Sequence, residues 1–139
     1  MRLLNYKKTL GILTFGALLF IASCKKDDGT TAGADDADKY VGTWSCIETE
    51  AGQPASNPFD INITKVNANT VRVANFSQLG TGISATFSVS GSAVSINQQI
   101  VDGIIYNGTG SLSGSKMNLS YSGDDGQTKK NYSAVCTKK

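Results

Sequence analysis

Apolar and polar residues are arranged in three different ways along this chain of 139 residues. Residues 10–22 form a nearly continuous apolar run. Residues 29–38 contain only Gly, Thr, Ala and Asp, and so lack the apolar side chains that a folded core needs. From Tyr40 onward apolar and polar residues alternate, as in strands with one buried face, and no helical period persists. The pattern therefore predicts an apolar segment, a polar linker and one β-rich domain.

The alternation beyond residue 40 predicts about eight short strands separated by turns. Ile61 and Ile63, for example, flank the polar Asn62. Strands of a parallel sheet covered on both faces would be continuously apolar, so that architecture is excluded. The predicted strands span residues 40–50, 59–66, 70–76, 83–89, 93–100, 104–112, 115–122 and 128–137.

Short turns between these strands favour an antiparallel, up-and-down arrangement. Asp102-Gly103 lies between two apolar pairs and is a strong hairpin signal, because glycine accepts a positive φ. The spacing of the strands fits a closed β-barrel, which leaves no strand edge exposed. We therefore expect an all-β antiparallel barrel, and a β-sandwich of the same strands is the alternative.

Two cysteines lie in the first and the last predicted strand. We expect a disulfide between Cys46 and Cys136, and such a bond favours a closed barrel, because closure places the first strand beside the last. The alternative is a pair of free, buried thiols. The disulfide requires a compartment outside the cytoplasm, where such bonds persist.

The first 23 residues are organised like a secretory signal peptide. Arg2, Lys7 and Lys8 precede the apolar run, and small residues follow it. The run falls short of the ~20 residues that a spanning helix needs. The net charge of +2 depends on these three basic residues, so the positive balance is an export signal rather than a nucleic-acid footprint, and no nucleic-acid partner is expected.

The segment 19–24, with the sequence LFIASC, resembles the bacterial lipobox. This resemblance implies cleavage after Ser23 and attachment of diacylglycerol and a further fatty acid such as palmitate to Cys24. Two or more acyl chains hold a protein stably at a membrane without a spanning helix. The expected division is a signal peptide over residues 1–23, a lipidated cysteine with a disordered linker over residues 24–38, and a barrel domain over residues 39–139.

The charged residues directly after the lipobox suggest a location. Lys25-Lys26-Asp27-Asp28 resembles the short signal that sends Bacteroidetes lipoproteins to the outer face of the outer membrane. The resemblance implies a lipid-anchored outer-membrane protein that is surface-exposed. The alternative is a charged linker on a lipoprotein of the periplasmic face.

The start of the first strand resembles the Gly-x-Trp motif of lipocalins. In that family the glycine allows close backbone approach and the tryptophan plugs one barrel end, which implies structural roles for Gly42 and Trp44. The chain lacks the family's arginine on the last strand, so Lys129 or Lys130 would have to cover the tryptophan. A barrel of about eight strands is either filled by side chains or just wide enough for one small ligand.

Strand alternation predicts which side chains line the barrel interior. Several of them combine an apolar body with a polar group, which suits binding of a small apolar or amphipathic molecule. Other inward positions are ordinary core, among them Ile61, Ile63, Ile96, Met117, Leu119 and Ala134. The candidate ligand-binding residues are Phe87, Gln98, Tyr106, Tyr121 and Tyr132.

The residues needed for common catalytic chemistry are scarce. The chain has no histidine, so the usual general base and metal ligand is absent, and neither a metal site nor a cofactor is expected. Glu48 and Glu50 share one face of the first strand, but such a pair more often marks the solvated end of a strand than an acid and base. The sequence therefore predicts a protein that is not an enzyme.

The expected function is binding of a small ligand by a lipid-anchored envelope protein. One alternative is a protein-binding barrel that resembles lipoprotein inhibitors of lysozymes or proteases, with the loops 51–58 or 123–126 meeting the partner. Another is a structural surface lipoprotein with a solid core.

Overall fold

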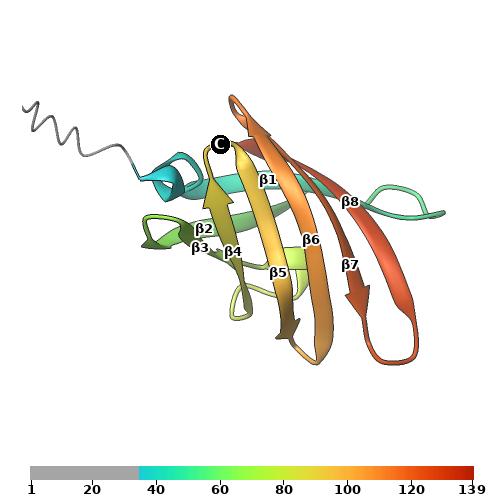
Figure 1. Ribbon diagram of the computed structural model, residues 1–139. Coiled ribbons are helices and arrows are strands. Elements are labelled where there is room, and N and C mark those ends of the chain that lie inside the picture. The colour runs from blue at the N-terminus through green and yellow to red at the C-terminus, as the bar shows by residue number, and fades with distance from the viewer. Residues whose placement is uncertain (1–34) are drawn as a thin grey trace, which may run out of the picture. The chain divides into compact units, whose positions relative to one another are not determined.

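The computed structural model describes residues 35–139 (Figure 1). The predicted signal peptide, the predicted lipidation site Cys24 and most of the predicted linker lie outside the described residues. In the described part of the chain, no helix is both long enough and apolar enough to cross a membrane.

Eight antiparallel strands form a closed barrel within residues 35–139 (Figure 1). Each strand pairs with the next one along the chain, and the first strand also pairs with the last. This confirms the predicted all-β, up-and-down barrel and excludes the sandwich. The strands are β1 (Gly42–Glu50), β2 (Phe59–Asn67), β3 (Thr70–Ala74), β4 (Ser84–Ser90), β5 (Ala93–Val101), β6 (Ile104–Ser113), β7 (Lys116–Asp124) and β8 (Lys129–Lys138).

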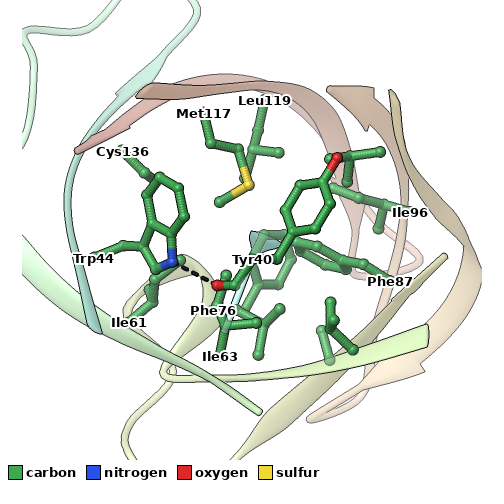
Figure 2. Close-up of a cluster of buried hydrophobic side chains, with 14 of the residues drawn as sticks. Tyr40, Trp44, Ile61, Ile63, Phe76, Phe87, Ile96, Met117, Leu119 and Cys136 are labelled. Atoms are coloured by element: carbon green, nitrogen blue, oxygen red, sulfur yellow. Dashed lines mark hydrogen bonds between the residues drawn. The ribbon is translucent and has the colours of Figure 1, made fainter. Parts of the chain in front are cut away.

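Alternate residues of the strands form the core inside the barrel, as their period predicted. In Figure 2 the labelled side chains of the strands point toward the centre, where Tyr40 and Phe76 join them from outside the strands. The buried residues that the strands contribute include Trp44, Cys46, Ile61, Ile63, Val71, Val73, Ala85, Phe87, Val89, Val94, Ile96, Tyr106, Met117, Leu119, Tyr121, Ala134 and Cys136.

The predicted inward orientation of Gln98 is wrong. The register between β5 and β6 shifts between Ile96 and Gln99, which is a β-bulge. The extra residue interrupts the alternation, so Gln98 and Ile100 are exposed and Val101 is buried.

One end of the barrel, here named the Trp44 end, is closed by Tyr40 and Trp44. The indole N–H of Trp44 donates to the carbonyl oxygen of Tyr40 at 2.8 Å (Figure 2). The hydroxyl of Tyr40 donates to the carbonyl oxygens of Gly91 and Ala93 at 3.1 and 3.3 Å. Gly42, between the two rings in sequence, has a φ of 130°, which side chains rarely adopt. The glycine of the Gly-x-Trp motif is therefore required by its backbone conformation.

A lysine at the end of the last strand covers the tryptophan. The ammonium of Lys138 lies 5.5 Å from the centroid of the Trp44 ring, a cation–π contact. The expectation that Lys129 or Lys130 would do so is wrong, because both lie at the beginning of β8, at the opposite end of the barrel.

Folded structure begins before the predicted domain boundary at residue 39. A 3₁₀ helix, η1 (Asp36–Lys39), precedes β1. Ala37 is buried, and its N–H donates to the carbonyl oxygen of Ala68 at 3.0 Å. Lys65 forms an ion pair with Asp38 at 2.8 Å. The end of the predicted disordered linker is therefore packed on the barrel.

The predicted disulfide is present between β1 and β8. Cys46 and Cys136 are direct cross-strand partners, with their Cα atoms 3.9 Å apart. The two cysteines are 90 residues apart in sequence. Closing a loop of that length removes unfolded-state entropy worth roughly 4 kcal/mol in the chain-entropy model. The bond fixes the seam at which the barrel closes.

Candidate functional site

The barrel end opposite Trp44 is here named the Phe76 end, and a loop closes it. A 3₁₀ helix, η2 (Phe76–Gln78), lies between β3 and β4 and carries Phe76 into the barrel. Asn75 and Ser77, which flank this ring in sequence, and Gln78 have φ values of 60°, 51° and 61°. Residues other than glycine adopt this left-handed conformation at a cost of roughly 1–2 kcal/mol each, and asparagine most readily.

The side chain of Asn75 holds the loop in this conformation. Its amide nitrogen donates to the carbonyl oxygen of Asp60 at 2.8 Å, and its amide oxygen accepts from the N–H of Gly80 at 2.8 Å. One side chain therefore ties the start of η2 to both β2 and the residues that follow the helix. Phe76 itself is 3% exposed.

Phe76 is the centre of an aromatic cluster. Its ring centroid lies 5.2 Å from that of Phe87, 5.2 Å from that of Tyr106 and 4.7 Å from that of Tyr121. Tyr132 stacks on the outer side of the cluster, 5.2 Å from Tyr121. Edge and tilted contacts of this kind contribute beyond simple area burial. The cluster unites four strands and η2 at one end of the barrel.

Glu48 lies next to this cluster and is only 8% exposed. One carboxylate oxygen accepts a hydrogen bond from the hydroxyl of Tyr121, and the other accepts from the hydroxyl of Ser77 at 3.4 Å. The assignment of Glu48 to the solvated end of a strand is therefore wrong. Its parity with Trp44 and Cys46 places it inside the barrel.

Burial dominates the electrostatics of this group. Desolvation raises the pKa of Glu48 above its ordinary value, and the hydroxyl bonds from Tyr121 and Ser77 oppose that rise. Burial, followed by the charge of Glu48, raises the pKa of Tyr121 far above its ordinary value. The phenol therefore stays protonated and remains the donor to the carboxylate.

Glycines of β6 and β7 make room for the tyrosines. A Cβ added to Gly108 would collide with the carbonyl oxygen of Ser120 and the Cβ of Tyr121. A Cβ added to Gly123 would lie 3.0 Å from the ring of Tyr106. Gly108 and Gly123 thus mark close approaches inside the barrel.

Two strand seams are incomplete at the Phe76 end. The pairing of β1 with β2 ends at Cys46, and β4 pairs with β5 only from Ser88 to Ser90. Side chains replace part of the missing ladder. Ser56 accepts from the N–H of Glu48 at 3.0 Å, and the amide of Gln99 bonds both the N–H and the carbonyl of Thr86, at 2.8 and 2.7 Å. The N–H of Ser56 also donates to the carbonyl oxygen of Glu48 at 2.7 Å, so the pairing of β4 with β5, with three residue pairs, is the shortest in the barrel.

The interior at the Phe76 end is filled. The remaining cavity has a volume of about 10 Å³, roughly that of one water molecule. Its wall includes Glu48, Phe76, Ser77 and Tyr121. A ligand of useful size therefore requires a side chain to move, and Phe76 is the member of the cluster that lies on a loop.

The structure brings four of the five predicted ligand-binding residues together. Phe87, Tyr106 and Tyr121 are buried in the aromatic cluster, and Tyr132 is half-buried beside it. Gln98 is exposed and separate from them. Whether the four bind a ligand stays a prediction.

Glu48 and Phe76 were not among the predicted residues of this site. Inward parity was a usable signal for Glu48, whereas no pattern indicated a loop-borne Phe76. Among residues 35–139, no group of three His, Cys, Asp or Glu side chains is placed to hold a metal ion.

An eight-stranded up-and-down barrel closed by Trp44 belongs to the lipocalin-like class of architectures. No family model and no curated protein matches the chain. Among solved structures, it is similar to EF1p2_mFAP2b bound to DFHBI, with a TM-score of 0.55, 13% identity, and coverage of 76% of this chain and 98% of that one. It also resembles a candidate outer-membrane protein of Bacteroides fragilis, with a TM-score of 0.47 and 15% identity, over 76% of this chain and 53% of that one. At these identities the likeness concerns the fold alone.

Proposed function

We propose that this protein is a non-catalytic, lipid-anchored protein of the cell envelope that binds a small amphipathic molecule at the Phe76 end of its barrel. The observation that carries the proposal is the position of Phe76. A core aromatic ring lies on a loop with left-handed backbone, among the side chains that the sequence singled out for ligand binding. Withdrawal of this ring would convert a filled barrel into one with an apolar, tyrosine-lined pocket.

The backbone of η2 supports this movement. Ser77 and Gln78 hold conformations that cost free energy in the closed state, and strain of this kind concentrates at ligand clamps and switch regions. The short pairing of β4 with β5, which spans three residue pairs, further reduces the number of backbone bonds that oppose it. The barrel of EF1p2_mFAP2b bound to DFHBI provides a precedent for a ligand on this fold.

The envelope location is supported by the chemistry of the cysteines. A disulfide between Cys46 and Cys136 suits a compartment outside the cytoplasm. The lipobox that ends at Cys24 supplies the membrane attachment, with surface exposure favoured over the periplasmic face by the Lys25-Lys26-Asp27-Asp28 sequence.

The neutral probe 2-phenylethanol, whose ring matches that of Phe76, tests the proposal in calorimetric titrations of the full chain in detergent. The Phe76→Ala variant should bind about tenfold more tightly than the original chain, because it removes the ring that a ligand must displace. Leu112→Ala is the matched control, since Leu112 is a partly buried side chain beyond the aromatic cluster. Absence of saturable binding to the folded Phe76→Ala chain would refute ligand binding at this end.

Protein binding is the second candidate, and the filled interior favours it. The loop between β7 and β8 presents a fixed acidic surface, because Asp125 accepts hydrogen bonds from the N–H groups of Gln127 and Thr128 at 2.9 and 2.7 Å. A null result with the probe, together with inhibition of a lysozyme or protease by the chain, would favour this function.

A further inference from the structure

Glu48 is a buried acid without a cation beside it. Glu50 pairs with Lys130 at 3.2 Å and Asp60 pairs with Lys139 at 2.6 Å, but among residues 35–139 no lysine or arginine forms an ion pair with Glu48. Its carboxylate is bonded only by two neutral hydroxyls, those of Tyr121 and Ser77. The two hydroxyls donate hydrogen bonds to the carboxylate oxygens but do not compensate the negative charge of Glu48.

The two hydroxyls differ in how firmly they are attached. Tyr121 lies within β7 and stays in place when η2 moves. Ser77 is next to Phe76 on η2, so withdrawal of the ring also withdraws this hydroxyl. The movement that opens the pocket therefore frees one oxygen of Glu48 toward the incoming ligand.

The surroundings of that oxygen favour a positive group. The rings of Tyr106 and Tyr121, whose centroids are 6.1 Å apart, stay around the site when Phe76 withdraws, and the faces of aromatic rings attract cations. An ammonium or amidinium has donors for the freed oxygen and compensates the buried charge. A neutral ligand would desolvate Glu48 further without compensation, and an anionic ligand would be repelled.

We propose that Glu48 determines the specificity of this site and selects an organic cation, a protonated amine or amidine on an apolar body about the size of the displaced Phe76 ring. This inference rests on the proposed function, since it requires that Phe76 withdraws. It assigns to Glu48 the role of counter-charge, with Tyr121 as the residue that positions its carboxylate.

Three ligands of matched size test the assignment by calorimetry on the full chain in detergent: 2-phenylethylamine, 2-phenylethanol and 3-phenylpropanoate. We expect the amine to bind about tenfold more tightly than the alcohol, as a charge-assisted hydrogen bond in a desolvated site predicts, and the carboxylate to bind least. All three ligands should bind more tightly to the Phe76→Ala chain than to the original chain, and the order of their affinities should be the same.

Variants of two neighbouring acids supply the control. Glu48→Gln keeps an acceptor for Tyr121 and removes the charge, so it should weaken the amine about tenfold and change the alcohol by less than about threefold. Glu50→Gln removes a carboxylate of the same strand that is already paired with Lys130, and should leave all three affinities within about twofold. Near-ultraviolet circular dichroism checks that each variant is folded.

The outcomes separate this inference from the function on which it rests. If 2-phenylethanol binds but the amine is not preferred to it, the cation assignment is overturned and small-ligand binding stands. If no probe binds either the original or the Phe76→Ala chain, both are overturned. The ratio of amine to alcohol in the original chain needs no variant, so a folding failure of Glu48→Gln would not protect the proposal.

Discussion

The two ends of the barrel are plugged by aromatic residues that lie outside the strands, and the two plugs are held differently. Tyr40 is fixed by polar contacts, because its carbonyl accepts from the indole of Trp44 and its hydroxyl donates to two backbone oxygens. Phe76 has no polar group on its ring, and the residues that follow it, Ser77 and Gln78, have positive φ. The first ring is anchored by hydrogen bonds of its own residue, whereas the second ring is held by packing and its loop by the side chain of Asn75.

This difference shows how one barrel combines an aromatic ring in a fixed position at one end with a ring that a ligand can displace at the other. Hydrogen bonds to the backbone specify a single position for Tyr40, whereas aromatic contacts of Phe76 can be replaced by those of a ligand of similar shape. We therefore expect substitutions to be most destabilising at the Trp44 end and most consequential for binding at the Phe76 end.

Removal of the tryptophan should have the largest effect on stability. Trp44→Ala leaves a cavity in the anchored end and deprives the Tyr40 carbonyl of its donor, so we expect a loss of about 4 kcal/mol in the free energy of unfolding. Denaturation in urea measures it. A loss below that of Phe76→Ala would reverse the assignment of the two ends.

Removal of the phenylalanine should cost about half as much. Phe76→Ala loses the same kind of packing, but the loop can relax from its left-handed conformation, so we expect a loss of about 2 kcal/mol. Saturating 2-phenylethanol should restore part of it, as a ligand that binds only the folded state must. A variant that is destabilised equally with and without the probe would contradict a releasable plug.

Much of the Trp44 end could be predicted from the sequence because its signals are local. Gly42 and Trp44 are two residues apart on one strand, and alternation alone assigns their orientations. The disulfide was expected between the two remaining cysteines of an exported chain, and it favoured the closed barrel. The covering lysine could also have been found, because pairing of Cys46 with Cys136 in antiparallel strands places Trp44 opposite Lys138.

The Phe76 end depends on contacts that the sequence does not display. Tyr121, the partner of Glu48, is 73 residues away along the chain. The strand predicted over residues 70–76 ends at Ala74, since Asn75 adopts a left-handed conformation that only its residue type hints at. Gln98 was misplaced because a β-bulge cannot be recognised from alternation.

The charge of Glu48 should make the stability of the Phe76 end depend on pH. Because burial raises its pKa above 4.5, the folded chain binds this proton more tightly than the unfolded chain does. The stabilisation is full below 4.5 and is lost as the pH rises through the folded pKa. Glu48→Gln should remove that decline, which urea denaturation between about pH 4 and pH 8 would detect.

That experiment compares the free energy of unfolding of the original chain with that of the Glu48→Gln chain at each pH. Asp36 and Asp125 have lowered pKa values, because they accept hydrogen bonds from backbone N–H groups and, for Asp36, from Lys39. The contributions of Asp36 and Asp125 to the free energy of unfolding rise with pH instead of falling. Because both chains contain these residues, their contributions cancel when the two chains are compared. Parallel curves for the original and the Glu48→Gln chains would show that the carboxylate titrates normally.

The cation over Trp44 should have the smallest effect. Lys138→Met keeps the aliphatic part of the side chain and removes the charge, so we expect a loss of about 0.5 kcal/mol at low salt and less at high salt. Thermal unfolding at two ionic strengths measures it. A loss that approached the effect of Trp44→Ala would mean that the lysine, and not the ring, closes this end.

The cross-strand bond between Cys46 and Cys136 has a consequence for a protein exposed to proteases. Every connection between consecutive strands lies between these two cysteines in sequence. A single cut in any hairpin therefore leaves two fragments that remain covalently linked, and the nicked molecule should migrate as one band until it is reduced. Damage to a loop would thus leave both parts of the barrel joined by the disulfide.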